Sequence, residues 1–397
     1  MSDLPNYPMP SYLSLNFLFC NLNMKQLNIL LLEPFHAGSH KAWAEGFAAN
    51  SRHDVELLTL KGRHWKWRMH GGAVTLAEKM MASDHQPDVI LATSMLDLTT
   101  FLSLTRERTA HTPVALYFHE NQITYPWSPQ DADVRLRQDR HYGFINYTSA
   151  LAADLVLFNS DYHRSSFLGA LWGFLKVYPD HRGLTNVDKI KTKSEVLYLG
   201  MNLSKFDEFR TAKNNNVPTI LWNHRWEYDK NPEEFFEVLF ELAEFGLDFK
   251  LIVLGENYDK SPPIFAEAKE KLARYIIHFG YASDFDTYAR LLWQADILPI
   301  TSRQDFFGGS VVEAMYCEVY PLLPNRLAYP EHIPPYLHIQ HFYDNRVSLV
   351  ELLKAYINNF QETKTSSFKS HVERYDWHQC VSKYDKTLEK LYAIKVS

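Results

Sequence analysis

Short apolar runs recur through the first half of the chain, and most of them are separated by stretches of helical length. A continuous apolar run is typical of a strand that is buried on both faces of a parallel sheet, and helices connect such strands. The pattern predicts a doubly wound α/β domain whose ligands bind beyond the carboxyl ends of the strands. The runs that we interpret as strands are residues 27–32, 55–60, 89–92, 114–118 and 155–158.

The same alternation begins again after a polar break at residues 213–216. Residues 232–245 and 285–294 are predicted helices between the new strands. The second half of the chain is therefore a second α/β domain of similar size. Its predicted strands are residues 219–222, 249–254, 276–279, 297–300 and 320–323.

We expect the first Rossmann-like domain to cover residues 24–212 and the second to cover residues 213–375. Residues 376–397 have helical spacing of apolar side chains and are expected to cross back onto the first domain. Residues 1–23 are interpreted as a poorly ordered extension or a misassigned start, because their apolar stretch is too short to span a bilayer and no Lys or Arg precedes it.

The composition and net charge of the chain limit the kinds of partner that it can bind. The chain has 397 residues, of which 46% are hydrophobic, enough to form the cores of two domains. Its formal net charge is −6, so a polyanionic partner must be bound by local patches. Cys20, Cys317 and Cys380 are odd in number and far apart, so we expect no disulfide framework and a reducing, cytoplasmic location.

Residues 302–315 contain the strongest candidate for a binding site. Two carboxylates flank an aromatic and glycine-rich turn, between a predicted strand and a helical pattern. The N–H groups at the start of a helix favour an anion, and glycines let a ligand approach the backbone. Asp305 and Glu313 can accept hydrogen bonds from paired sugar hydroxyls. A sugar nucleotide meets both demands.

The second half of the chain resembles the retaining GT-B glycosyltransferases related to sucrose and mannosyl transferases. The resemblance implies two Rossmann-like domains that face each other across a cleft, with the donor bound mainly by the second. The segments that carry it, in matching order and spacing, are residues 222–232, 251–256, 278–281, 295–297 and 305–313.

The resemblance assigns Arg225 and Lys230 to the donor diphosphate and to catalysis. Breaking a sugar–phosphate bond builds negative charge on the diphosphate, and two fixed cations stabilise that charge without a metal. The alternative is that both residues form surface ion pairs with Glu227, Asp229 or Glu233, each worth less than about 1 kcal/mol.

The turn itself receives its roles from the same resemblance. Glu313 is expected to bind the ribose hydroxyls of the nucleotide, and Asp305 the hydroxyls of the donor sugar, as a catalytic residue. The family usually has Glu where Asp305 stands, which bears on sugar preference. Alternatively, Asp305 caps a turn and Glu313 lies on a solvated helix face. The other expected donor contacts are Phe307, Gly308, Gly309 and Ser310.

Loops of the first domain are expected to form the opposing wall. The resemblance places His119 against the donor sugar or the acceptor as a catalytic residue, and we assign Glu120 and Asn121 to the acceptor. Alternatively, His119 is structural and Glu120 only orients it. Gly38 matches a glycine loop that approaches the donor phosphates. The polar residues after it that we assign to the acceptor are Ser39, His40 and Lys41.

No metal site is predicted. Asp131 and Asp133, like Asp284 and Asp286, mimic the Asp-x-Asp metal motif of another glycosyltransferase class, but neither pair follows a predicted strand. The chain also lacks the His-Glu-x-x-His spacing of zinc enzymes. We therefore expect a nucleotide-sugar donor and no metal cofactor.

Several segments resemble one subfamily more closely, the tRNA-queuosine α-mannosyltransferases. The resemblance implies transfer of mannose from GDP-mannose to the cyclopentenediol of queuosine in the anticodon of aspartate tRNA, with retention of the anomeric configuration. The segments that carry it include residues 33–41, 63–68, 118–126, 178–182 and 222–230.

An RNA acceptor has local support, because cations alternate with tryptophans just after the second predicted strand. Such a mixture can bind phosphates and stack on bases. Alternatively, the tryptophans are core and the cations form a solvated face. The acceptor contacts predicted in this segment are Arg63, Trp65, Trp67 and Arg68, with Lys61 and Lys66 beside them. A second basic cluster comprises Arg135, Arg137, Arg140 and His141.

Other functions stay open at this level. Because Asp305 replaces the usual Glu, the chain could be an inactive sugar-nucleotide or RNA binding protein. It could also be a GT-B enzyme that uses another nucleotide sugar and a small-molecule, glycan or lipid acceptor. The absence of a clear basic amphipathic helix from the sequence argues against a membrane partner.

Overall fold

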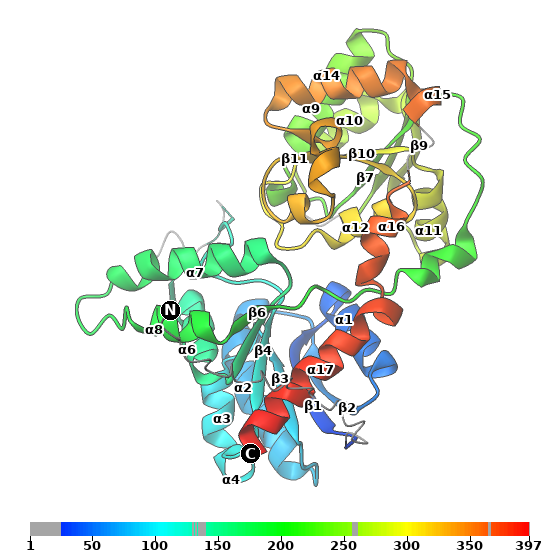
Figure 1. Cartoon of the computed structure of the whole chain (residues 1–397). Coiled ribbons are helices and arrows are strands. Elements are labelled where there is room, and N and C mark those ends of the chain that lie inside the picture. The colour runs from blue at the N-terminus through cyan, green and yellow to red at the C-terminus, as the bar shows by residue number, and fades with distance from the viewer. Residues whose placement is uncertain are drawn as a thin grey trace, which may run out of the picture.

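Two six-stranded parallel sheets form the centres of two domains (Figure 1). The structure, a computed structural model, describes residues 25–128, 131, 133, 140–255, 261–363 and 367–396. The strand order is β2-β1-β3-β4-β5-β6 in the first sheet and β12-β11-β10-β7-β8-β9 in the second. This arrangement confirms the predicted fold class of two doubly wound α/β units.

Helices cover the first sheet, and every residue of its central strands β3 and β4 is buried, as their continuous apolar runs require. The strands are β1 (Asn28–His36), β2 (Asp54–Lys61), β3 (Val89–Thr93), β4 (Val114–Phe118), β5 (Leu155–Phe158) and β6 (Ser194–Val196). The helices are α1 (Gly38–Asn50), α2 (Trp65–Ala82), α3 (Leu98–Leu104), α4 (Arg106–Thr109), α6 (Arg140–Ala152), α7 (Asp161–Lys176) and α8 (Asn186–Thr192).

The second sheet has a separate apolar core, in which Trp222 packs against Phe235 and Phe236 of the following helix. Its strands are β7 (Thr219–Asn223), β8 (Lys250–Leu254), β9 (Ile276–Gly280), β10 (Ile297–Pro299), β11 (Tyr320–Pro324) and β12 (Phe342–Tyr343). Its helices are α9 (Pro232–Glu244), α10 (Ile264–Lys271), α11 (Phe285–Gln294), α12 (Gly309–Tyr316), α13 (His338–His341), α14 (Arg346–Asn358), α15 (Phe360–Thr363) and α16 (Lys369–Val372).

The structure corrects the predicted loop after the first strand. β1 continues to His36, which still pairs with Lys61 of β2, and α1 begins at Gly38. The segment between them is therefore a sharp strand-to-helix junction. The residues that become helical as a result are Ser39, His40 and Lys41. The short edge strands β6 and β12 were also not predicted.

The last helix, α17 (Trp377–Val396), lies across the first domain (Figure 1). The indole of Trp43 on α1 donates a hydrogen bond to the Tyr384 hydroxyl at 3.1 Å, and the Gly200 N–H donates to the same oxygen at 3.1 Å. Trp377 packs so closely on Gly46 and Gly200 that neither could carry a Cβ. The end of the chain therefore completes the core of the first domain.

Direct hydrogen bonds join the two domains. Ser160 Oγ, before α7, donates to the Phe306 carbonyl at 2.5 Å. The Glu331 carboxylate accepts from the N–H groups of Asp161 and Tyr162, at 3.0 and 2.8 Å. A carboxylate at a helix N-terminus is favourably placed. Among the described residues, no helix is both long and apolar enough to cross a membrane.

Candidate active site

Gly38 lies at the junction between β1 and α1, with a left-handed φ of +51° that favours glycine. A Cβ at this position would meet no heavy atom within 4 Å, so the backbone borders open space. Ser39 and Lys41 are exposed in the same turn. Because the first N–H groups of a helix lack partners within it, this turn suits an anionic group such as a diphosphate.

His40 faces the protein interior instead. Its Nδ1 lies 3.0 Å from Glu33 Oε2, and its Nε2 lies 3.6 Å from Glu120 Oε2. Burial alone would lower the pKa of His40, but the two carboxylates raise it to about 10. His40 is therefore a buried cation between two anions. Its side chain is only 7% exposed and both of its ring nitrogens face carboxylates, and its contact with the acceptor stays a prediction.

His119 directly follows β4 and is buried against the rings of His40 and Trp43, with centroids 4.3 and 4.6 Å away. Burial, and then the charge of His40, keep the pKa of His119 well below its usual value, so the ring is neutral. Its buried Nε2 has no hydrogen-bond partner among the described residues. A neutral imidazole of this kind can still bond to a sugar hydroxyl.

The next two residues have different environments. Glu120 is partly exposed. Asn121 is fully buried, and its Oδ1 accepts hydrogen bonds from the N–H groups of Ile123 and Thr124 at 3.0 and 2.9 Å. Asn121 therefore holds an Asx turn together. Its predicted contact with the acceptor is corrected to a structural role.

Lys230 and Asp305 contact each other directly in the second domain. Lys230 Nζ donates to the Gln304 carbonyl at 2.8 Å and lies 3.3 Å from Asp305 Oδ2. The Tyr329 hydroxyl donates to the same carboxylate oxygen at 3.1 Å. Burial alone would raise the pKa of Asp305, but Lys230 in particular lowers it, so Asp305 is ionised. Lys230 Nζ also lies 3.4 Å from Asp229 Oδ2, a partner that the alternative named, but with side chains 11% and 1% exposed this ion pair is buried and not on the surface.

Arg225 is more accessible, with a side chain that is 48% exposed and lies 3.3 Å from Glu227 Oε1. This contact is the surface ion pair anticipated as the alternative. Arg225 nevertheless acts across the domain boundary, because its charge contributes to lowering the pKa of Glu120. Arg225 and Glu120 therefore interact electrostatically across the domain boundary.

The turn before α12 is shaped by its backbone. Gly308 has a φ of +88°, and a Cβ there would lie 3.0 Å from the Tyr329 ring. Phe307 is buried, and its carbonyl lies 2.6 Å from His332 Nε2. Gly309 and Ser310 then begin α12, whose first N–H groups can receive an anion. The Ser310 hydroxyl is hydrogen-bonded to His224 Nδ1 at 2.9 Å.

Glu313 lies one turn further along α12 and accepts a 2.6 Å hydrogen bond from the Tyr288 hydroxyl. Burial raises the pKa of Glu313 to about 7, against the opposing effect of that hydrogen bond. Glu313 is therefore not on a solvated helix face, as the alternative held. A half-buried carboxylate with one remaining oxygen suits a hydroxyl-bearing ligand.

The basic and aromatic segment at the start of α2 has two different parts. Lys66 Nζ lies 2.6 Å from Asp131 and 2.5 Å from Asp133, so these carboxylates hold a lysine. Trp65 packs against Trp127, with ring centroids 6.3 Å apart, which fits the core alternative.

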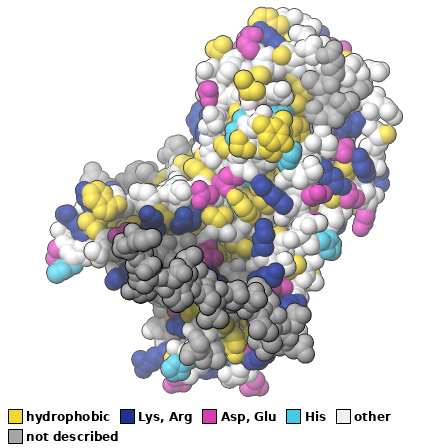
Figure 2. All heavy atoms as spheres, in the orientation of Figure 1, with side chains coloured by type: hydrophobic (Ala, Val, Ile, Leu, Met, Phe, Trp, Pro, Cys, Tyr) yellow, Lys and Arg dark blue, Asp and Glu magenta, His cyan; other side chains and the backbone are white. Residues whose placement is uncertain are grey.

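Other residues of the segment remain accessible. Trp67 is 63% exposed, and Arg63 is exposed beside it. Arg68 donates its Nε–H to the Lys61 carbonyl at 3.1 Å. Arg140 and His141 begin α6, whereas Arg135 and Arg137 lie outside the described residues. On the face shown in Figure 2, Lys and Arg side chains are scattered among Asp and Glu. RNA phosphates would therefore have to be bound by local cations such as Arg63 and Arg68.

Three residues of the site were missed by the sequence analysis: Glu33, Tyr288 and Tyr329. Glu33, His40 and His119 each bring one potential ligand atom within 4.8 Å of the others, a spacing that a cation could bridge. However, the Glu33 carboxylate already accepts hydrogen bonds from the Phe35 N–H and from His40. The Asp284 and Asp286 pair, which resembles an Asp-x-Asp metal motif in sequence, has other partners in the structure. Asp284 caps α11 and Asp286 pairs with Arg290.

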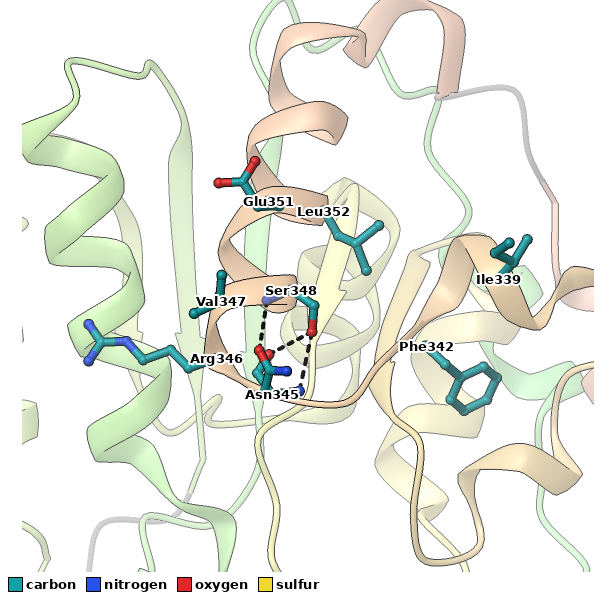
Figure 3. A pocket seen from close by; sticks show the side chains of 8 residues that line it. All are labelled: Ile339, Phe342, Asn345, Arg346, Val347, Ser348, Glu351 and Leu352. Carbon is teal, nitrogen blue, oxygen red and sulfur yellow. Dashed lines mark hydrogen bonds between the residues drawn. The ribbon is translucent and has the colours of Figure 1, made fainter.

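One cavity of about 770 Å³ lies elsewhere, at the start of α14 (Figure 3). Asn345 caps this helix by accepting a hydrogen bond from the Ser348 N–H at 3.1 Å. The exposed side chains of Ile339 and Val347 line the cavity. None of the predicted site residues does so.

Comparison with solved structures shows the fold. HepE from Anabaena, in complex with UDP and glucose, is 16% identical and matches with a TM-score of 0.60 over 92% of this chain and 100% of its own. Sucrose-phosphate synthase from Thermosynechococcus elongatus is 12% identical and matches with a TM-score of 0.64 over 93% of this chain and 100% of its own. A family model described as "Glycosyl transferases group 1" matches residues 204–362. The chain is therefore a glycosyltransferase of the GT-B class.

A second family model, "tRNA-queuosine alpha-mannosyltransferase N-terminal", matches residues 28–201. A tRNA-queuosine alpha-mannosyltransferase from Drosophila melanogaster is 33% identical over 370 residues, which cover 90% of this chain and 95% of that protein. A GDP-mannose:cellobiosyl-diphosphopolyprenol alpha-mannosyltransferase from Xanthomonas oryzae is 25% identical, over 42% of this chain and 45% of that protein. The chain belongs to the tRNA-queuosine alpha-mannosyltransferase family.

Proposed function

We propose that this enzyme transfers mannose from GDP-mannose to queuosine in tRNA, with retention of the anomeric configuration. The observation that carries the proposal is the 33% identity to a tRNA-queuosine alpha-mannosyltransferase over 90% of the chain. The name of the Xanthomonas relative, a GDP-mannose-dependent enzyme, supports the choice of donor.

The second domain would bind the donor. In this proposal Glu313 receives the ribose hydroxyls, and Asp305, held by Lys230 and Tyr329, receives hydroxyls of the mannose. Arg225 and Lys230 stabilise the charge that develops on the leaving diphosphate, an electrostatic role that is strongest where water is excluded. The turns at Gly38 and Gly308 to Ser310 offer backbone N–H groups to the same phosphates.

The first domain would bind the acceptor. The unpartnered Nε2 of His119 is available to the transferred sugar, and Glu120 to the acceptor. Trp67 and Arg63 would contact the RNA by stacking and by phosphate binding.

Incubation with GDP-mannose and queuosine-containing aspartate tRNA, followed by nuclease digestion and mass spectrometry, tests the proposal. We expect one hexose to be added to the queuosine nucleoside. An unmodified nucleoside, together with hexose transfer to a glycan or lipid, would overturn it. Parallel reactions with UDP-glucose and with tRNA that lacks queuosine test the donor and the acceptor separately.

We also propose that no metal is required, because Arg225 and Lys230 supply the positive charge at the diphosphate. Transfer should therefore persist after dialysis against excess EDTA. Loss of transfer that is restored by a divalent cation would contradict this and would direct attention to Glu33, His40 and His119.

A further inference from the structure

Glu33 is the starting point, because it is a carboxylate buried completely near the end of β1. Its Oε1 accepts the Phe35 N–H at 2.7 Å, and its Oε2 lies 3.0 Å from His40 Nδ1. An ionised carboxylate is costly to bury unless a charge and hydrogen bonds compensate it. His40 is the cation that compensates Glu33.

His40 transmits this interaction toward the domain boundary. Both of its ring nitrogens face carboxylates, Nδ1 toward Glu33 and Nε2 toward Glu120 at 3.6 Å. Only the doubly protonated ring can donate to both sides. The other titratable group packed against His40 is His119, which is neutral, and Phe35 contacts its edge.

Glu120 is the accessible end of this chain of charges, with a side chain that is 30% exposed. Burial alone would raise its pKa, but His40, and then Arg225 of the second domain, bring the pKa below its usual value. Glu120 is therefore an anion that lies 3.6 Å from the buried His40 and interacts electrostatically with Arg225 of the second domain.

We infer that Glu33 and His40 are positioning residues that hold the Glu120 carboxylate at the domain boundary, where it binds hydroxyls of the acceptor. The inference rests on the proposed function, in which the acceptor group is a cyclopentenediol. An ionised carboxylate accepts hydrogen bonds from hydroxyl groups, and such charge-assisted hydrogen bonds are stronger than those between neutral groups.

The test compares Glu33→Gln, Glu120→Gln and a matched control, Glu56→Gln. Glu56 also pairs with a histidine, His85, but on the edge strand β2 and with a side chain that is 44% exposed. Glu33→Gln and Glu120→Gln should each raise the KM for queuosine-tRNA at pH 8 by about tenfold, the effect of losing one charge-assisted hydrogen bond. The KM for GDP-mannose should stay within about twofold of wild type in both variants, and all kinetic parameters of Glu56→Gln should do so as well.

A pH series separates positioning from a merely structural role. Without Glu33, His40 loses its proton more easily, so the ratio of variant to wild-type KM should fall as the pH is lowered from 8.5 to 6 and His40 regains its charge. The ratio for Glu120→Gln should not recover. A Glu33→Gln ratio that does not depend on pH, or an equal rise in the KM for GDP-mannose, would overturn the inference.

The inference and the proposed function can fail separately. If wild type adds no hexose to queuosine-tRNA, the proposed function fails. Nitrogen-15 NMR of the histidines still tests the Glu33–His40 pair in the free protein. The His40 imidazolium should persist above pH 8 in wild type and titrate at a lower pH in Glu33→Gln. Identical titration in the two proteins would overturn the coupling between Glu33 and His40.

Discussion

The direct contact between Lys230 and Asp305 links two residues of the candidate site that lie far apart in sequence. Lys230 also holds the Gln304 carbonyl, so it orders the segment that leads into the donor turn. Its charge therefore has two uses in the proposed reaction, binding the turn and stabilising the diphosphate.

Replacing Lys230 should reveal how much its charge contributes to the reaction. Lys230→Ala is expected to lower kcat by about a hundredfold or more, as for loss of one preorganised donor to a developing charge. Steady-state mannosyl transfer measures the effect, and circular dichroism should show an unchanged fold. Lys271→Ala, at a side chain of α10 that is 58% exposed, is the matched control and should keep full activity. Full turnover by Lys230→Ala would remove it from the donor site.

If Glu313 binds the donor as proposed, donor binding should depend on pH. Its pKa of about 7 means that the ionised form predominates above pH 7 and is lost as the pH falls through 7. Because the ionised form is the stronger hydrogen-bond acceptor, the Kd for GDP-mannose should rise as the pH is lowered from 8 to 6. Calorimetry of wild type and of Glu313→Gln checks this. The variant should bind weakly and show a flat profile; a flat wild-type profile would contradict the assignment.

At the scale of elements, the junctions between strands and helices carry the site. The turn between β10 and α12 depends on Gly308, which is left-handed and lies against Tyr329. The same tyrosine donates a hydrogen bond to Asp305, so the turn and the Asp305 carboxylate are connected through Tyr329.

Gly308→Ala should therefore impair both stability and donor binding. Strain at a left-handed residue costs about 1–3 kcal/mol, and the added Cβ would push the Tyr329 ring away from Asp305. We expect a lower thermal midpoint and a raised KM for GDP-mannose. Gly169→Ala, in the exposed part of α7 where a Cβ meets nothing within 4 Å, should be neutral or slightly stabilising. Equal behaviour of the two variants would disprove the role of the turn.

The sequence predicts these elements unevenly, for physical reasons. Central strands such as β3 and β4 are apolar on both faces, so their pattern alone identifies them. The edge strands β6 and β12 are too short to show a pattern, and pairing with a neighbouring strand defines them.

Residues of the candidate site also differ in how well the sequence predicts them. Asp305 and Glu313 could be predicted because they flank a recognisable turn. Glu33 could not, because at the end of an apolar run it looks like an ordinary polar boundary, and only the fold brings His40 and Glu120 into line with it. Asn121 was assigned to the acceptor because it follows Glu120 directly. The sequence does not reveal that its side chain turns inward to hold the Asx turn.

At the scale of the whole molecule, α17 makes the first domain dependent on the end of the chain. The Tyr384 hydroxyl accepts from Trp43 and from the Gly200 N–H and donates to the Tyr198 carbonyl at 2.7 Å. All of these groups belong to the first domain. Trp43 is separated from Tyr384 by more than half of the chain in sequence.

Tyr384→Phe removes this shared hydroxyl and should destabilise the first domain by about 2–3 kcal/mol, because it leaves buried polar groups unpaired. Urea unfolding followed by tryptophan fluorescence measures the shift in midpoint. Tyr281→Phe, at a side chain that is 69% exposed, is the control and should unfold like wild type. Coincident unfolding curves for Tyr384→Phe and wild type would show that α17 contributes little to that core.

The packing of α17 on α1 also sets an order of events during synthesis. Trp43 leaves the ribosome early, whereas Tyr384, whose hydroxyl accepts its indole N–H, is made 341 residues later. Trp377, which packs on Phe47, belongs to the same late segment. One apolar face of the first domain therefore stays uncovered throughout the synthesis of the second domain, until α17 has been made. Termination shortly before residue 377 would leave that surface exposed.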